Sequence, residues 1–204
     1  NPKVFLGYSD TTVCHLLCFR AGLTSFYGPA FMAGFAENAG MFPYMVASVR
    51  KTLCSADPIG VVESNREGWT VERLDWAVPE NQLRRRRLNP RTPWRFLQGQ
   101  GTAKGRLIGG CLEVLEWLRG TAIWPEPTAF EGGILFLETS EEALPPSALA
   151  RALRVYASMG ILHRLSGILF GRPGGAIPAD SFRRYDDAIL RVVADEEGLT
   201  RLPI

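Results

Sequence analysis

The stretch Lys3-Val4-Phe5-Leu6-Gly7-Tyr8-Ser9-Asp10-Thr11-Thr12 is an apolar run that reaches a glycine, turns at a serine and continues as a helix pattern. It predicts a buried strand over residues 3–7 and a helix over residues 11–21. A sharp turn of this kind can expose a serine Oγ as a nucleophile. The turn reads G-x-S-D, so the G-x-S-x-G motif does not match. The competing interpretation is that Ser9 or Asp10 caps the helix.

A strand followed by a helix indicates an α/β fold. Residues 23–28 form a short apolar segment that Gly28-Pro29 ends. A single strand-helix unit cannot cover both faces of a parallel sheet. We therefore expect the flanking strands to precede Asn1 in a longer parent chain. The ending Leu202-Pro203-Ile204 also looks cut.

The composition of the chain limits which classes of function it can have. A chain of 204 residues with 46% hydrophobic content can bury a sizeable core. A net charge of +2 gives no argument for nucleic acid or a membrane surface, and no apolar window is long enough to span a bilayer. The four cysteines lack zinc-ligand spacing and favour a reducing compartment, so we expect a cytoplasmic protein without metal or other cofactor.

Residues 29–103 read as a linker and insert. The pattern predicts a helix over residues 43–54 and a strand over residues 59–62. Trp69, Trp76 and Trp94 stand among polar residues, where they could stack on a planar ligand or simply pack. The run Arg84–Arg87 could grip phosphate, although such runs are more often solvated faces.

The second half carries the clearer periodicity. Residues 106–108 lead into Gly109-Gly110, a turn that could accept an anion but is better explained by close backbone packing, and a helix is expected over residues 111–119. A buried strand over residues 133–137 delivers Glu138 at its carboxyl end, where α/β proteins place their chemistry. Further elements are a long helix that Pro145-Pro146-Ser147 starts and that runs to about Met159, a strand within 161–170 after a break at Ser166-Gly167, and a helix over 181–197.

A nucleophilic serine needs a base, and the chain has two histidines. His15 follows Ser9 by six residues on the same expected helix and points to another face. His163 has no catalytic residue type beside it. We interpret both as structural or surface residues, which leaves a candidate nucleophile and a candidate carboxylate without a base.

Five ordered blocks resemble the LD-carboxypeptidase family of serine peptidases, and the tryptophan-rich insert resembles its microcin C self-immunity branch. The resemblance spans essentially the whole chain. The blocks are Phe5-Leu6-Gly7-Tyr8-Ser9-Asp10-Thr11-Thr12, Phe26-Tyr27-Gly28-Pro29, Gly105-Arg106-Leu107-Ile108-Gly109-Gly110-Cys111, Ile134-Leu135-Phe136-Leu137-Glu138 and Gly167-Ile168-Leu169-Phe170-Gly171-Arg172.

The resemblance implies a Ser-Glu-His triad. Ser9 matches the nucleophile, Glu138 the carboxylate that orients histidine, and the Asp10 backbone N–H one donor of the oxyanion hole. The family's Gly-His motif follows a segment similar to Leu202-Pro203-Ile204, so the histidine is expected after Ile204 and the fragment itself is expected to be inactive.

The resemblance also implies how the domains divide. Residues 1–28 would be the end of a flavodoxin- or amidotransferase-like parallel-sheet N-terminal domain. Residues 29–103 would be the linker and insert, and residues 104–204 most of a mixed α/β C-terminal domain.

The implied reaction is amide hydrolysis through an acyl-enzyme on Ser9. The substrate would be a murein L,D-peptide or an aspartyl-nucleotide conjugate of the microcin C type, with Trp76 or Trp94 stacking on the base, and relatives leave a homodimer open. A second hypothesis is a non-catalytic module of the same fold that binds a nucleotide or anion through Arg84–Arg87 and nearby tryptophans.

Overall fold

The chain divides into two compact units. The computed structural model describes residues 3–204. One unit, called unit 1, comprises the chain up to Gly7 together with Gly28–Arg95, and unit 2 comprises Tyr8–Tyr27 with Phe96–Ile204. The sequence-based boundaries after residues 28 and 103 differ from this partition, because the helix after Ser9 packs with the second half of the chain.

Unit 2 is built on a three-stranded parallel sheet in the order β3-β4-β5. Its strands are β3 (Leu107–Cys111), β4 (Ile134–Glu138) and β5 (Gly167–Phe170). Parallel strands need crossover connections, which helices supply here. The register pairs Cys111 with Glu138, so the carboxyl ends of β3 and β4 lie side by side. This edge of the sheet is the place where α/β proteins collect functional groups.

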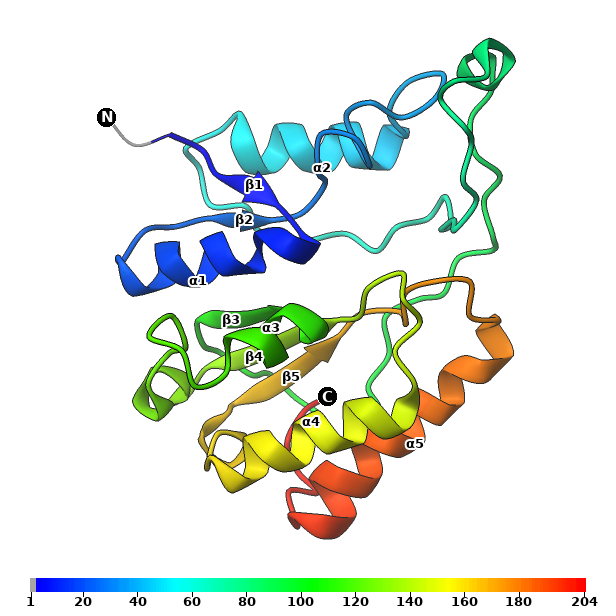
Figure 1. Cartoon of the computed structure of the whole chain (residues 1–204). Helices are drawn as coiled ribbons and strands as arrows, with labels where there is room; N and C mark the ends of the chain where they lie inside the picture. The colour runs from blue at the N-terminus through cyan, green and yellow to red at the C-terminus, as the bar shows by residue number, and fades with distance from the viewer. Residues whose placement is uncertain (1–2) are drawn as a thin grey trace. The chain divides into compact units, whose positions relative to one another are not determined.

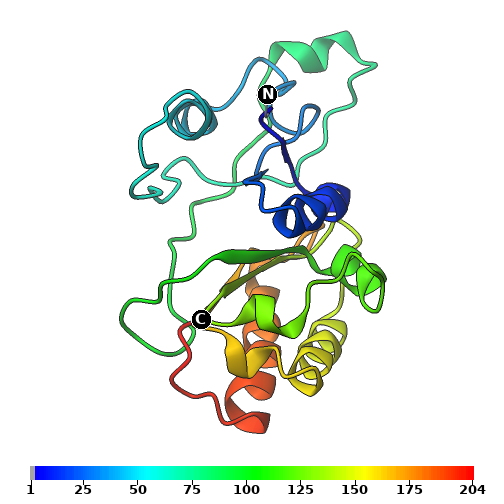
Figure 2. The same cartoon turned by 90° about the vertical axis from the view of Figure 1, so that its left-hand side faces the viewer.

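Helices cover both faces of this sheet. Figures 1 and 2 show α1 (Thr12–Arg20) on one side and α4 (Pro146–Ser158) with α5 (Arg183–Leu190) on the other. A π-helical segment, Arg191–Glu196, continues α5, and α3 (Leu112–Leu118) follows β3 directly. The core between them is mostly aliphatic, with a few buried aromatic residues; its fully buried members include Leu112, Leu135, Leu149, Leu153, Tyr156, Ile161, Leu162, Ile189 and Val192.

Strand β3 runs through Gly109 and Gly110, where the sequence predicted a turn before the helix. Both glycines have positive φ, of 152° and 144°. A Cβ on Gly109 would lie 1.8 Å from the carbonyl oxygen of Phe136, and one on Gly110 would lie 2.6 Å from the Thr12 side chain. Close packing therefore explains the pair, and the helix begins one residue later than expected.

Short 3-10 turns punctuate unit 2. They are Ser9–Thr11, Pro127–Phe130, Leu162–Arg164 and Ala179–Phe182. The end of the chain lies beside β5, because the Ile168 N–H donates to the carbonyl oxygen of Pro203 at 2.9 Å. The Leu97 N–H also donates to the Ile204 carbonyl at 2.7 Å. These bonds tie the last residues to the sheet.

Unit 1 has less regular structure. It contains β1 (Leu6–Gly7), α2 (Pro43–Leu53) and a 3-10 turn over Pro79–Leu83, while the short strand β2 (Phe26–Tyr27) belongs to unit 2. The strand predicted over residues 59–62 is wrong: this segment is irregular, and Val61 and Val62 are 72% and 58% exposed. Apolar residues there have no sheet to pack on. No helix within the described residues is long and apolar enough to cross a membrane.

Candidate active site

Ser9 occupies a strained turn at the entrance to α1. Its φ is +59°, a left-handed conformation that non-glycine residues rarely adopt. It begins the 3-10 turn Ser9–Thr11 that leads into α1, and Tyr8 holds the N-cap position without a side-chain capping bond. Thr11 is the N-cap of α1 itself, also without such a bond. Ser9 therefore makes no side-chain capping bond to the helix, which argues against the cap interpretation, and its role as a nucleophile stays a prediction.

Glu138 is joined to this turn through one tyrosine hydroxyl. It is the last residue of β4, and its side chain is half-buried. The Tyr27 O–H donates to Glu138 Oε1 at 2.6 Å, and the Ser9 N–H donates to the same Tyr27 oxygen at 2.9 Å. Ser9 and Glu138, predicted from separate sequence blocks, are therefore linked by a single shared partner within unit 2.

Burial shifts the pKa values of Glu138 and Tyr27. It raises the pKa of Glu138, and the negative charges of Glu113 and Glu141 add to the rise, while the bonds from Tyr27 and the Ser9 N–H oppose it. Burial and the bond to Glu138 also raise the pKa of Tyr27. The phenol therefore remains a proton donor across the physiological range, and the carboxylate depends on its donors to stay ionised.

A second layer of hydrogen bonds fixes the chain after Glu138. Glu113 Oε1 accepts the Ser140 N–H at 2.9 Å and the Ser140 O–H at 2.8 Å. The Gly174 N–H donates to Thr139 Oγ1 at 2.9 Å. Sequence reasoning did not identify Tyr27 or Glu113 as site residues, although Tyr27 stands in the Phe26-Tyr27-Gly28-Pro29 block that could have drawn attention to it.

The two histidines have other partners. His15 is buried, with Nδ1 at 2.8 Å from the Ser25 hydroxyl, and its ring contacts that of Tyr27. His163 is exposed and lies 2.9 Å from Glu197. Neither contact involves Ser9, in agreement with the interpretation of both as structural or surface residues. Asp10 is exposed, and the role of its N–H in an oxyanion hole stays a prediction.

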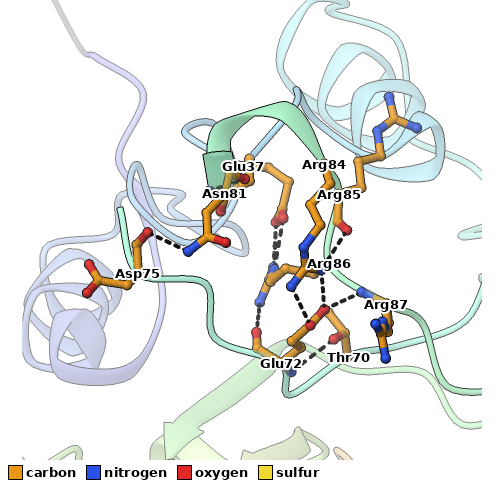
Figure 3. Close-up of polar contacts among 10 residues, drawn as sticks. Glu37, Thr70, Glu72, Asp75, Asn81, Arg84, Arg85, Arg86 and Arg87 are labelled. Atoms are coloured by element: carbon orange, nitrogen blue, oxygen red, sulfur yellow. Dashed lines mark hydrogen bonds and ion pairs between the residues drawn. The ribbon is translucent and has the colours of Figure 1, made fainter. Parts of the chain in front are cut away.

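The aromatic and basic candidates belong to unit 1. Trp76 and Trp94 are 48% and 66% exposed. Carboxylates already engage two of the four arginines: Arg84 binds Glu72 at 3.0 Å, and Arg86 binds the buried Glu37 at 2.8 Å (Figure 3). These pairs weaken the case for Arg84–Arg87 as a free phosphate grip.

The described residues hold no cluster of three or more His, Cys, Asp or Glu side chains suited to a metal ion. All four cysteines are free thiols. Burial raises the pKa of the Cys111 thiol to about 12, with smaller contributions from Glu138 and Glu113. Cys111 is thus an inert, protonated neighbour of the candidate carboxylate.

Comparison with known proteins places this geometry in a family. Residues 104–204 match the LD-carboxypeptidase C-terminal domain. A candidate carboxypeptidase of Vibrio cholerae is 30% identical over 96% of this chain and 56% of its own length. The microcin C7 self-immunity protein MccF of Escherichia coli is 30% identical over 95% of the chain and 54% of its own length. The chain therefore spans just over half the length of these relatives.

Solved structures agree with the sequence relatives. The MccF-like protein of Streptococcus pneumoniae, solved with AMP, superposes with a TM-score of 0.82 at 29% identity and covers all of this chain and 60% of its own. MccF with aspartyl sulfamoyl adenosine gives a TM-score of 0.74 at 27% identity, covering all of this chain and 58% of its own. By its matched domain, its relatives and its fold, the chain belongs to the LD-carboxypeptidase and MccF-like family.

Proposed function

We propose that this chain carries the nucleophile and the carboxylate of a Ser-Glu-His triad in a serine hydrolase that cleaves an amide bond. Ser9 would attack the carbonyl carbon, and Glu138 would orient and stabilise the histidine. The observation that carries the proposal is the pairing of a strained serine at φ +59° with a half-buried strand-end carboxylate through the hydroxyl of Tyr27. The matched family is a family of peptidases, which supports the same class of reaction.

The third member would follow Ile204 in the natural protein. The final segment is hydrogen-bonded beside β5 of the sheet whose neighbouring strand β4 ends in Glu138. The longer relatives have room for such a residue. Sequencing the gene beyond the Ile204 codon tests this directly, and the absence of a nearby histidine codon would favour the non-catalytic binding module instead.

The proposed reaction proceeds through an acyl-enzyme. The histidine takes the Ser9 Oγ proton as Oγ bonds to the carbonyl carbon, and the resulting oxyanion is stabilised by backbone donors, among them the Asp10 N–H. The histidine then returns the proton to the leaving amine as the C–N bond breaks. Water repeats the sequence, adding to the ester and releasing the acid and Ser9.

The proposed substrate is a peptidyl nucleotide or a murein L,D-peptide. The solved complexes of related proteins with AMP and aspartyl sulfamoyl adenosine favour the first. Trp76 and Trp94 are the proposed stacking residues, since each exposes a large aromatic surface. We propose a cytoplasmic location on the cysteine usage, while a homodimer is left open.

The test compares the natural protein that contains this chain with its Ser9→Ala variant on two substrates. We expect Ser9→Ala to lower kcat by about 10³-fold or more for whichever is cleaved, an L,D-tetrapeptide or aspartyl sulfamoyl adenosine. The Cys18→Ala variant, at a half-buried position of α1, serves as the matched control and should retain activity. Undiminished hydrolysis of both substrates by Ser9→Ala would refute the serine assignment.

A further inference from the structure

Half-buried Tyr27 has ring contacts with two elements of unit 2. Its ring meets that of Phe136 of β4 edge-on at 5.1 Å and an interplanar angle of 65°. On α1, the His15 ring lies at 5.1 Å and 50°. His15 is in turn fixed by the Ser25 hydroxyl at 2.8 Å. Two elements thus determine where the phenol oxygen lies.

The hydroxyl closes a directed chain of hydrogen bonds. An ionised carboxylate only accepts, so the single phenolic proton goes to Glu138 Oε1 at 2.6 Å. The Tyr27 oxygen can then accept the Ser9 N–H at 2.9 Å and the Thr12 hydroxyl at 3.2 Å. Because the Tyr27 proton goes to Glu138, the Thr12 hydroxyl is the donor to Tyr27, while its own oxygen accepts the Cys111 N–H at 3.0 Å. The hydrogen bonds thus run from the β3 backbone through Thr12 and Tyr27 to the carboxylate, and the Ser9 N–H is close enough to lower the pKa of Glu138 as well.

From this arrangement we propose that Tyr27 is a positioning residue, which holds the Ser9 turn and the Glu138 carboxylate in fixed relation and keeps the carboxylate ionised through its hydroxyl. The proposal rests on the proposed function, because it assigns Tyr27 a part in the same Ser9 and Glu138 pair. The bond from the Ser9 N–H also helps to offset the cost of the left-handed turn.

The charges around Glu138 explain why a donor is needed there. Glu113 on α3 and Glu141 after β4 both raise its pKa, in addition to burial. The Cys111 thiol at the end of β3 stays protonated and supplies no compensating positive charge. Tyr27 and the Ser9 N–H are the groups that lower the pKa of Glu138. Loss of the Tyr27 hydroxyl therefore favours the neutral acid, which orients a histidine poorly.

The experiment is Tyr27→Phe in the natural protein that contains this chain, with Tyr185→Phe as the matched control. Tyr185 also donates one hydrogen bond, to the Leu144 carbonyl at 2.7 Å, and its ring is buried in unit 2. We expect Tyr27→Phe to lower kcat by about 10- to 100-fold with KM nearly unchanged, and to move the acidic limb of the pH profile upward. Tyr185→Phe should lower Tm without moving that limb.

A second measurement needs no substrate. The Glu138 carboxyl carbon is titrated by NMR in wild type and in both variants, and Tyr27→Phe alone should raise its pKa. An unchanged Glu138 pKa and an unchanged kcat in a folded Tyr27→Phe protein would overturn the inference. Hydrolysis that survives Ser9→Ala would instead refute the proposed function, and the NMR titration would still decide whether Tyr27 controls Glu138.

Discussion

At the scale of single residues, the surroundings of the Glu138 carboxyl group disfavour its ionised form. Its pKa is raised above the ordinary value of 4.5, chiefly by burial. The folded state then holds the Glu138 proton more tightly than the unfolded chain does. The corresponding stability is present at pH values below the unfolded pKa and is lost as the pH rises through the folded pKa.

This linkage predicts how Glu138→Gln responds to pH. Glutamine keeps a similar shape and stays neutral. The free energy of unfolding of the variant should therefore increase relative to that of wild type as the pH rises from about 4 to 8. Urea denaturation at a series of pH values measures the difference. Glu196→Gln is the control of opposite sign, because Arg154 lowers the pKa of Glu196. A difference for Glu138→Gln that is flat with pH contradicts the prediction.

Residue-level reasoning from the sequence predicted Ser9 and Glu138 as site residues, a prediction that stays untested, and it did not point to Tyr27. A serine at a strand-to-helix turn and a glutamate at a strand end leave a local pattern. Tyr27 acts through hydrogen bonds with Ser9 and Glu138, which lie 18 and 111 positions away from it in the sequence. No local periodicity records such partners, and the sequence block containing Tyr27 drew attention only through family resemblance.

At the scale of elements, β3 shows how the sheet depends on glycine. Gly110 lets the strand pass against α1, where a Cβ would lie 2.6 Å from both Thr12 Cγ2 and Oγ1. The same Thr12 oxygen accepts the Cys111 N–H. The Thr12 side chain therefore takes part both in the packing of the sheet and in the series of hydrogen bonds that leads to Glu138.

We predict that Gly110→Ala destabilises the protein by about 2–4 kcal/mol, because it adds a clash to an unfavourable φ. The matched control is Gly120→Ala, at φ +81° with nothing within 4 Å of the added Cβ. Its cost should be about 1 kcal/mol, from backbone strain alone. Chemical denaturation measures both, and equal losses would contradict the packing argument.

The arginine run in unit 1 makes a second prediction at this scale. The Glu37 side chain is only 2% exposed and binds Arg86, while Glu72, at 26%, binds Arg84. Removing the Glu37 charge leaves Arg86 without its buried partner, so Glu37→Gln should cost about 3–5 kcal/mol. Glu72→Gln should cost much less, because solvent screens this carboxylate and its ion pair. Hydrogen exchange of unit 1 amides reports both losses, and similar effects would show that burial does not matter here.

Element-level prediction worked where periodicity was strong. The helix that became α4 and the strand that became β4 were confirmed to within a residue or two, since α4 carries apolar residues at helical spacing and β4 is a continuous apolar run that ends at Glu138. Residues 59–62 failed because β-branched residues indicate a strand only where a partner strand exists. Gly109 and Gly110 were read as a turn because nothing local reveals that Phe136 and Thr12 approach them closely.

At the scale of the whole molecule, Ser9 and Glu138 belong to unit 2, and the candidate stacking residues Trp76 and Trp94 belong to unit 1. The α/β class followed from the strand-helix pattern and the family from the order of five sequence blocks, and the comparisons confirm both. The partition into units did not follow, because it depends on where residues 8–27 pack and not on where the composition changes. Long-range packing of this kind leaves no mark on a local stretch of sequence.

The buried thiol of Cys111 offers a consequence of a different kind. It is 1% exposed at the strand end beside Glu138, whereas Cys14 and Cys54 are exposed. An alkylating reagent should therefore modify those two thiols at once and reach Cys111 only when the edge of the sheet opens. The rate at which Cys111 is alkylated therefore measures how often the structure opens locally at the candidate active site. Mass spectrometry can follow this rate without any substrate.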